Sequence, residues 1–279
     1  MKRSDYLRLA LAALVALVVA GASAQPYPNR AVRMIIPFPP GGTLDTLGRA
    51  MAQKLGDQTG QSFVVENRPG GNGIIGADAV AKAQADGYTL LFNASTFVTA
   101  PMTMKQVPYA IEKDFTPIAL VAKAPLSVAI AKDRPVTDIR SLIAYAKANG
   151  DKTTFAVGSI GSAGHLATEL LKRAGGIAYT VVPYKGTAPA FQDLLGGRID
   201  GFIDPILGSL AYHKAGQLRV VAGTSGTRTP NLPDVPTVAE TIPCYESYSW
   251  YGVWGPANLP ADIRAKLNAE VNKALASPE

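Results

Sequence analysis

From Ala31 onward the chain alternates short apolar runs with segments of helical periodicity. One such segment places Leu44, Leu47, Met51 and Leu55 on a single helical stripe. This alternation predicts βαβ units and parallel sheets, and the nearly continuous apolar strands predict helices on both faces. The predicted strands are 31–38, 62–67, 88–94, 153–159, 179–184, 199–204 and 218–225, and the predicted helices begin at Thr43, Ile74, Gly164, near Pro189 and at Ile206.

The alternation stops twice. Residues 114–138 hold two apolar runs joined through Ala124-Pro125 without a helix, and residues 228–260 are rich in proline and aromatic residues. Two breaks indicate that the chain leaves one α/β lobe, builds a second and returns. We therefore predict an α/β protein with two lobes and a cleft between them. Lobe 1 comprises 25–124 and 249–279, and lobe 2 comprises 125–248.

Residues 1–24 have the features of a signal peptide. Basic residues precede an apolar run from Leu9 to about Gly21, and Ala22-Ser23-Ala24 is the small-x-small pattern that a signal peptidase recognises. The alternative is a retained membrane anchor, but the run is shorter than the roughly 20 residues that cross a bilayer. We expect cleavage before Gln25 and secretion to the periplasm.

Composition narrows the possible functions. With 47% apolar residues the chain can form a sizeable core, and its net charge of +6 is spread without a basic cluster, so nucleic-acid binding is not expected. Its single cysteine, Cys244, allows no internal disulfide and is expected to be a small buried residue. Two histidines and the lack of a G-x-S-x-G motif argue against covalent catalysis and metal ligation, so we expect neither an enzyme nor a cofactor.

The first strand-to-helix turn, residues 37–49, is a candidate ligand loop. Ligands in open parallel sheets lie beyond the carboxyl ends of the strands. Gly41 and Gly42 let the backbone approach a ligand closely, and the free amides at a helix start attract anions. The alternative is an ordinary tight turn, with Thr43 as the N-cap and Asp45 in the first turn.

A second candidate is the stretch from Val157 to Leu171. Three glycines and two serines, Ser159 and Ser162, directly precede a helix that begins around Ala163. Amides and hydroxyls would converge there at the positive end of a helix, which describes an anion cradle. His165 in the first turn could donate to a ligand in its neutral form, or it could cap the helix and pack.

Two further segments end strands and begin helices. The strand that ends at Tyr184 leads to a helix near Thr187, and Asp204-Pro205 follows the strand 199–204. Asp204 could face a ligand. Alternatively it is an N-cap followed by proline at the first helical position.

Residues Gly71 to Gly76 match the dinucleotide-binding pattern G-x-G-x-x-G between a strand and a helix. The following strand, however, ends at Asn93, where an acidic residue should hold the ribose. An NAD-binding oxidoreductase therefore remains only the alternative function.

Several segments together resemble the Bug family of periplasmic solute-binding receptors for tripartite tricarboxylate transporters. They are YPNRAVRMIIPFPPGGTLDTLGRAMAQKL, VVENRPGGNGIIGADAVAKAQADGYTLLF, VGSIGSAGHLATELLKRAG, VPYKGTAPAFQDLLGGRIDGF and RTPNLPDVPTVAET. The resemblance implies a type II periplasmic-binding-protein fold, two lobes joined by two hinge strands, which closes on a small organic carboxylate. The family's ligand loops fall on Phe38, Pro40, Gly41, Thr43, Asn93, Ser95, Thr96, Ser159, Gly161, Ser162, His165, Tyr184, Thr187, Ala188 and Asp204.

The resemblance also implies partners, namely the carboxylate and the membrane components of the transporter. A monomer is expected, and a role in signalling to a sensor kinase is a further alternative. Two features depart from the family pattern: Thr241-Ile242 replaces a glycine after a glutamate, and relatives continue beyond Glu279 with more helix. A truncated lobe 1 with an uncovered helical face is therefore expected. Phe97 or Tyr184 could select the ligand.

Overall fold

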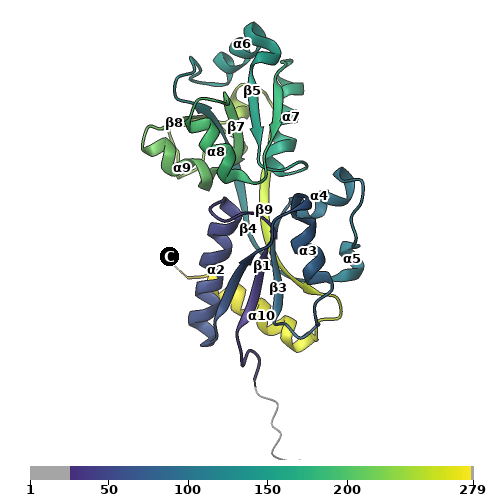
Figure 1. The fold of residues 1–279 in the computed structure, drawn as a ribbon. Coiled ribbons are helices and arrows are strands. Elements are labelled where there is room, and N and C mark those ends of the chain that lie inside the picture. The colour runs from purple at the N-terminus through teal and green to yellow at the C-terminus, as the bar shows by residue number, and fades with distance from the viewer. Residues whose placement is uncertain (1–25, 278–279) are drawn as a thin grey trace, which may run out of the picture.

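The computed structural model describes residues 26–277, so the predicted signal peptide lies outside the described residues. Two α/β lobes lie end to end and are joined by the long strands β4 and β9 (Figure 1). The nine strands are ordered β2-β1-β3-β9-β4-β7-β5-β6, and β8 pairs with β4. This is the predicted architecture of two lobes on two shared strands.

Lobe 1 is built on the strands β1 (Val32–Ile36), β2 (Phe63–Asn67), β3 (Thr89–Ala94) and β9 (Tyr248–Pro256). The first three are parallel, whereas β9 is antiparallel to β3. Neighbouring residues of β3 point to opposite faces: Phe92 lies in one apolar cluster with residues of α2 (Thr43–Thr59) and α10 (Ala261–Leu275), and Leu91 lies in another with residues of α3 (Ile74–Ala81) and α4 (Thr96–Thr103). Both faces of the sheet are thus covered.

Lobe 2 repeats this plan. Its strands are β5 (Thr154–Val157), β6 (Thr180–Pro183), β7 (Gly201–Pro205) and β8 (Leu218–Gly223), together with the second half of β4. On one face Val128 packs with α6 (Ile139–Asn149) and α7 (Ala163–Ala174), and on the other Ala129 packs with α8 (Thr187–Leu195) and α9 (Ile206–Lys214). The short elements are α5 (Ile111–Asp114), η1 (Gly71–Gly73), η2 (Gly150–Lys152) and η3 (Val238–Glu240).

The two apolar runs joined at Ala124-Pro125 form one strand, β4 (Phe115–Ala131), and not two. Its residues from Phe115 to Pro125 pair with β9, and those from Leu126 onward pair with β7 and β8. All of these pairs are antiparallel, whereas the strands of the βαβ units pair in parallel as predicted. The reason is that the connecting strand enters lobe 2 against the direction of the βαβ units. We retain the lobe boundaries at 124/125 and 248/249 as a proposal.

The helix starts at Thr43, Ile74 and Ile206 lie where the sequence predicts them, and α7 begins at Ala163. The helices α4, α6 and α10 and the strand β9 were missed. The alternative interpretations of Thr43 and Asp204 as N-caps were wrong, because Gly42 is the N-cap of α2, and Asp204 stays inside β7 with Pro205 at the cap of α9. Cys244 is exposed in a turn with a φ of 64°, so the expectation of burial was also wrong.

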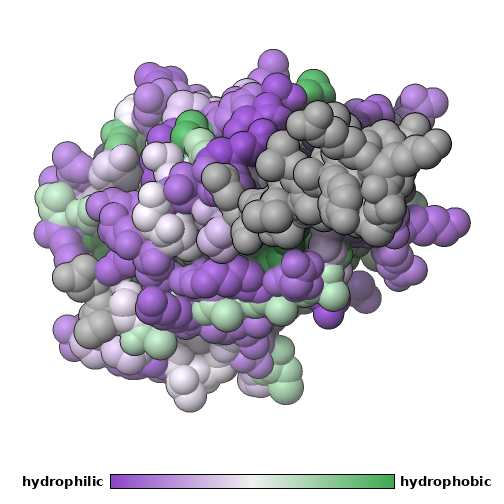
Figure 2. Space-filling view, turned by 90° about the horizontal axis from the view of Figure 1, so that it is seen from below, coloured by the Kyte–Doolittle hydropathy of each residue, from purple (hydrophilic) through white to green (hydrophobic). Residues whose placement is uncertain are grey.

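The far end of lobe 1 is formed by α10, which buries Leu267, Val271 and Ala274 against α2 and β4. Seen from this end, the visible surface is mostly hydrophilic with isolated apolar residues (Figure 2). No helix within residues 26–277 is long and apolar enough to cross a membrane.

Candidate functional site

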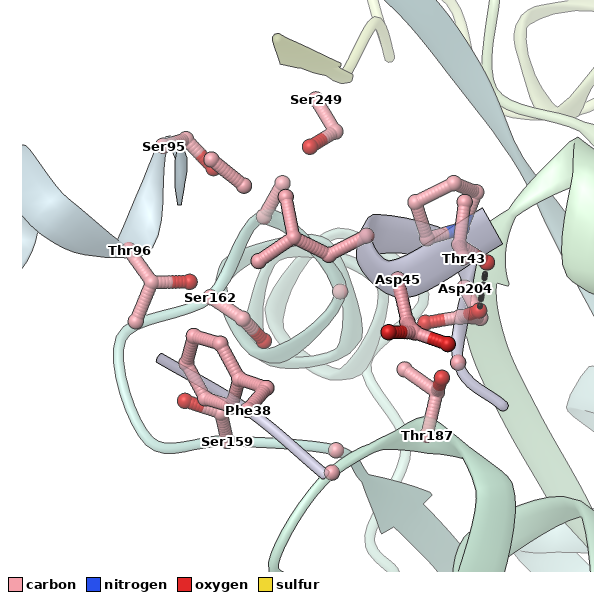
Figure 3. Close-up of a pocket in the computed structure, with 18 of the residues that line it drawn as sticks. Phe38, Thr43, Asp45, Ser95, Thr96, Ser159, Ser162, Thr187, Asp204 and Ser249 are labelled. Atoms are coloured by element: carbon pink, nitrogen blue, oxygen red, sulfur yellow. Dashed lines mark hydrogen bonds between the residues drawn. The ribbon is translucent and has the colours of Figure 1, made fainter. Parts of the chain in front are cut away.

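A cavity lies between the lobes at the carboxyl ends of the parallel strands (Figure 3). Its volume is about 70 Å³. Nine of the fifteen predicted ligand residues line it: Phe38, Thr43, Ser95, Thr96, Ser159, Ser162, Thr187, Ala188 and Asp204. Asp45, Ser249 and Tyr251 also line it, and the sequence reasoning did not include them among the ligand residues.

The first residues of four helices meet at this cavity. α2 begins at Thr43 and α4 at Thr96 in lobe 1, while α7 begins at Ala163 and α8 at Thr187 in lobe 2; all four residues line the wall. The first amides of a helix have no partner within the helix, and the helix dipole makes this end positive. Four such ends around one cavity give its wall a positive electrostatic character that suits an anion.

The cavity wall is rich in hydroxyl groups and contains no lysine, arginine or histidine. Seven serine and threonine residues contribute to it: Thr43, Ser95, Thr96, Ser159, Ser162, Thr187 and Ser249. The Oγ of Ser95 is buried and has no hydrogen-bond partner among the described residues. A buried hydroxyl normally has a partner, so Ser95 is suited to contact a ligand.

The amides of Gly41 and Gly161, which were expected to face the ligand, are bonded within their own turns. Gly41 N donates to Asp45 Oδ2 at 3.0 Å, and Gly161 N donates to His165 Nδ1 at 3.0 Å. Both glycines have a positive φ, 83° and 76°, which turns the amide toward the first turn of the following helix. Both lobes therefore have the same local arrangement, in which a glycine amide donates to the side chain four residues later.

This arrangement shows whether His165 faces a ligand or caps its helix. Its Nδ1 accepts from Gly161, and its own amide donates to Ser162 Oγ at 3.1 Å. Ser162 is the N-cap of α7. His165 thus completes the cap, and it does not line the cavity.

The remaining predicted residues lie off the cavity wall. Pro40 is exposed, and Asn93 is buried in β3, where its Oδ1 accepts from Ala94 N at 2.8 Å. The Tyr184 hydroxyl donates to Asp193 Oδ2 at 2.6 Å. Phe97 packs among Tyr109, Phe115 and Trp254 in the core of lobe 1, so it cannot select the ligand. These residues were predicted wrongly as cavity residues because the sequence does not show which side chains near the end of a strand turn away from the cavity.

Asp45 is a carboxylate held by its own lobe. Besides Gly41, it accepts from Arg49 Nε at 2.9 Å and from Asn67 Nδ2 at 2.8 Å. Burial by itself would raise the pKa of Asp45, but hydrogen bonds from Arg49, Gly41 and Asn67 outweigh it, and the pKa lies below its ordinary value. Asp45 is therefore ionised, with its charge compensated by Arg49.

Asp204 has the opposite environment. Its side chain is 4% exposed, and its one hydrogen bond from a described side chain comes from Thr43 Oγ1 of lobe 1 at 3.4 Å, drawn dashed in Figure 3. Burial raises the pKa of Asp204 well above its ordinary value, and the bond from Thr43 offsets this only in part. The environment of Asp204 therefore favours its protonated form more than solvent does.

Further contacts close the cleft around the cavity. Thr99 Oγ1 of lobe 1 donates to the Gly161 carbonyl at 2.7 Å, and Asn72 Nδ2 donates to the Ile160 carbonyl at 2.7 Å. The Ser159 hydroxyl donates to Asn72 Oδ1. The structure thus shows the two lobes in contact, in a closed arrangement.

The glycine-rich segment from Gly71 to Gly76 contributes Asn72 to these contacts. Residues 71–73 form the turn η1, which lies beside a second cavity of about 490 Å³. This cavity shares Phe38 and Gly186 with the first. The segment has a role in lobe contact that does not require a nucleotide. Residues 26–277 also contain no group of three or more potential metal ligands.

Comparison with known proteins agrees with this geometry. Residues 47–279 match the model of the tripartite tricarboxylate transporter family receptor. Protein BugT of Bordetella pertussis is 39% identical over 266 residues, which cover 93% of this chain and 81% of BugT.

Two solved structures share the fold. Rpa4515 of R. palustris, solved with adipate, has a TM-score of 0.88 and 39% identity, covering 90% of this chain and 85% of Rpa4515. The periplasmic binding protein BugD has a TM-score of 0.86 and 38% identity, with the same coverage. This chain thus shares the fold of a periplasmic binding protein. The chain therefore belongs to the tripartite tricarboxylate transporter receptor family.

Proposed function

We propose that this protein captures a small organic carboxylate in the periplasm and presents it to the membrane components of a tripartite tricarboxylate transporter. The observation that carries the proposal is the convergence of four helix starts, from both lobes, on one cavity without basic side chains. Peptide amides at helix starts bind an anion without full positive charges.

The kind of anion follows from the donors of the site. A carboxylate accepts short, charge-assisted bonds from amides and hydroxyls, each worth about 1.5–3 kcal/mol. Phosphate recognition commonly adds lysine or arginine, and neither lines the cavity. The relative Rpa4515 was solved with adipate, which supports a carboxylate as the ligand class.

Capture proceeds by closure of the two lobes about β4 and β9. The contacts of Thr43 with Asp204 and of Thr99 with Gly161 form only when the lobes meet, and they surround the ligand site. The ligand joins the helix starts of one lobe to those of the other and thereby stabilises the closed form. A membrane partner can then distinguish the closed receptor from the open one.

The proposed periplasmic location is supported by residues 1–24, and the proposed transporter partners are supported by the family to which the chain belongs. Residues 1–24 have the pattern of a cleaved signal peptide. Delivery to the transporter by a monomeric receptor is the proposed role. Signalling by the same closed form to a sensor kinase is distinguished from uptake by transport assays in cells that lack this receptor.

A thermal-shift screen of mono-, di- and tricarboxylates tests the proposal. A ligand at 100 times its Kd should stabilise the receptor by about 2.7 kcal/mol, equivalent to a Tm rise of roughly 5–10 °C. The diamide of each dicarboxylate is the control, because it keeps the shape and lacks the charge. The proposal is wrong if no acid raises the Tm, and a response to NAD or NADP alone would favour the oxidoreductase alternative.

A further inference from the structure

The cavity at the four helix starts, the first cavity, holds little more than one carboxylate group. Its volume is about 70 Å³, whereas pockets for small molecules commonly have about 300–1,000 Å³. A water takes about 30 Å³ in the liquid, so this space holds roughly two or three waters, which is about the size of a carboxylate. The rest of a larger ligand must therefore lie outside the first cavity.

The second cavity adjoins the first and has the room that the first lacks. Its volume is about 490 Å³, and its wall comes from both lobes, with residues 69–73 on one side and 184–186 on the other. Four residues line both cavities: Phe38, Pro39, Gly158 and Gly186. The second cavity is therefore the space beside the first in which the chain of a bound carboxylate has room.

The wall of the second cavity suits an apolar chain. Apolar side chains make up part of it, and glycines supply much of the rest. The apolar members are Phe38, Pro39, Pro69 and Ile160. The polar side chains of Asn72 and Tyr184 are already bonded to other residues of the protein. An alkyl chain needs no hydrogen-bond partner, so it can enter this space and gain from the burial of its methylene groups.

Lys185 is the one charged residue that lines the second cavity in the described part of the chain. Tyr184 N donates to the Val157 carbonyl at 2.8 Å, and Gly186 N donates to the Gly158 carbonyl at 2.7 Å. These bonds fix the backbone on both sides of Lys185. Its side chain is exposed and has no ion-pair partner within residues 26–277. Because the ammonium group is a charge on a flexible stem, it can reach an acid in this cavity.

This inference rests on the proposed function and deepens it. We propose that the ligand occupies both cavities: one carboxylate lies at the helix starts, an apolar chain lies in the second cavity, and a second acid pairs with Lys185. The substrate class is then a dicarboxylate with an apolar chain. Lys185 determines the preference for a dicarboxylate over the monocarboxylate of the same length.

Three ligands that each add one feature test the inference by titration calorimetry of the purified receptor. Acetate is a carboxylate with one methyl group, hexanoate adds an alkyl chain, and adipate adds a second acid to that chain. Hexanoate should bind at least about tenfold more tightly than acetate, because its methylene groups leave water in the second cavity. Adipate should bind roughly three- to tenfold more tightly than hexanoate, through an exposed ion pair and its two equivalent ends.

The variant Lys185→Gln removes the charge and keeps a polar side chain. It should lower the preference for adipate over hexanoate to about twofold, the value that two equivalent ends give, and leave the Kd of hexanoate unchanged. Unchanged hexanoate binding also shows that the variant is folded. Lys147→Gln is the matched control, because Lys147 is exposed on α6 at the far end of lobe 2 (Figure 1). It should leave all three affinities unchanged.

Two results would overturn the inference and leave carboxylate capture intact. One is hexanoate that binds no more tightly than acetate, and the other is an undiminished preference for adipate in Lys185→Gln. The inference is also wrong if none of the three ligands binds while another acid of the thermal-shift screen does. If no acid binds at all, both proposals are wrong.

Discussion

The side chain of Asn72 joins the two lobes through the carbonyl of Ile160, to which its Nδ2 donates at 2.7 Å. The two residues are 88 positions apart in the sequence, and the contact exists only because the cleft is closed. Asn72 has a φ of 58°, a conformation that asparagine tolerates better than most residues. It lies outside the ligand cavity, so it acts on binding through closure.

Removal of the Asn72 side chain should therefore weaken ligand binding without changing the site. Asn72→Gly keeps the left-handed backbone accessible and removes the bonds to Ile160 and Ser159. We expect Kd to rise by roughly 5- to 30-fold, equivalent to about 1–2 kcal/mol, mainly through faster ligand release. Calorimetry and stopped-flow measurements check this. Asn149→Gly removes a similar bond to Tyr145 far from the cleft and should leave Kd unchanged.

A methyl group at Gly161 should obstruct closure. A Cβ there would lie 2.8 Å from Thr103 Oγ1 and 3.1 Å from Thr99 Oγ1, both in lobe 1. Gly161→Ala should therefore prevent the ligand-induced compaction seen by small-angle X-ray scattering. Gly176→Ala is the matched control, because Gly176 has a φ of 57° with nothing within 4 Å. Both variants should lose about 1–2 kcal/mol of stability from the left-handed backbone, but only Gly161→Ala should lose binding.

A large side chain at Ser162 should fill the cavity. Ser162→Trp is expected to abolish carboxylate binding, measured by calorimetry, while the receptor still unfolds cooperatively. The change also removes the N-cap of α7. Ser162→Ala isolates that effect and should lower the free energy of unfolding by about 0.5–2 kcal/mol. Retention of full affinity by Ser162→Trp would show that the ligand lies elsewhere.

The stability of the ligand-free receptor should depend on Asp204. Its pKa is raised in the folded protein, so between the ordinary pKa and the raised one the folded state holds one more proton than the unfolded state. This contribution is complete at low pH and is lost as the pH rises toward the folded pKa, at up to about 1.4 kcal/mol per pH unit.

The substitution Asp204→Asn removes the titrating carboxyl group, so the variant does not show this pH dependence. The difference in unfolding free energy between Asp204→Asn and the original chain should therefore grow in favour of the variant as the pH rises above the ordinary aspartate pKa, until the pH passes the folded pKa, as urea unfolding would measure. A difference that stays constant from pH 3 upward would mean that the pKa of Asp204 is not raised by burial.

Much of the fold follows from local patterns. The helix start at Thr43 could be predicted because turn residues precede a 3.6-residue apolar period, and those at Ile74 and Ile206 because a glycine or a proline directly precedes each. By contrast, α4 was missed because Pro101 and several threonines interrupt its pattern over only eight residues. The strand β9 lies in a proline- and aromatic-rich segment, and its pairing partners β3 and β4 are more than 100 residues away.

The sequence by itself determined that glycine and serine residues begin helices at the ends of parallel strands, and hence that an anion site was expected near them. Helix starts and their caps depend on neighbours within about four residues, so local sequence suffices. Only the tertiary structure decided which groups face the cavity. It buried Asp204 beside Thr43 of the other lobe and brought Asn72 to Ile160, because these outcomes depend on contacts between lobes that no local pattern encodes.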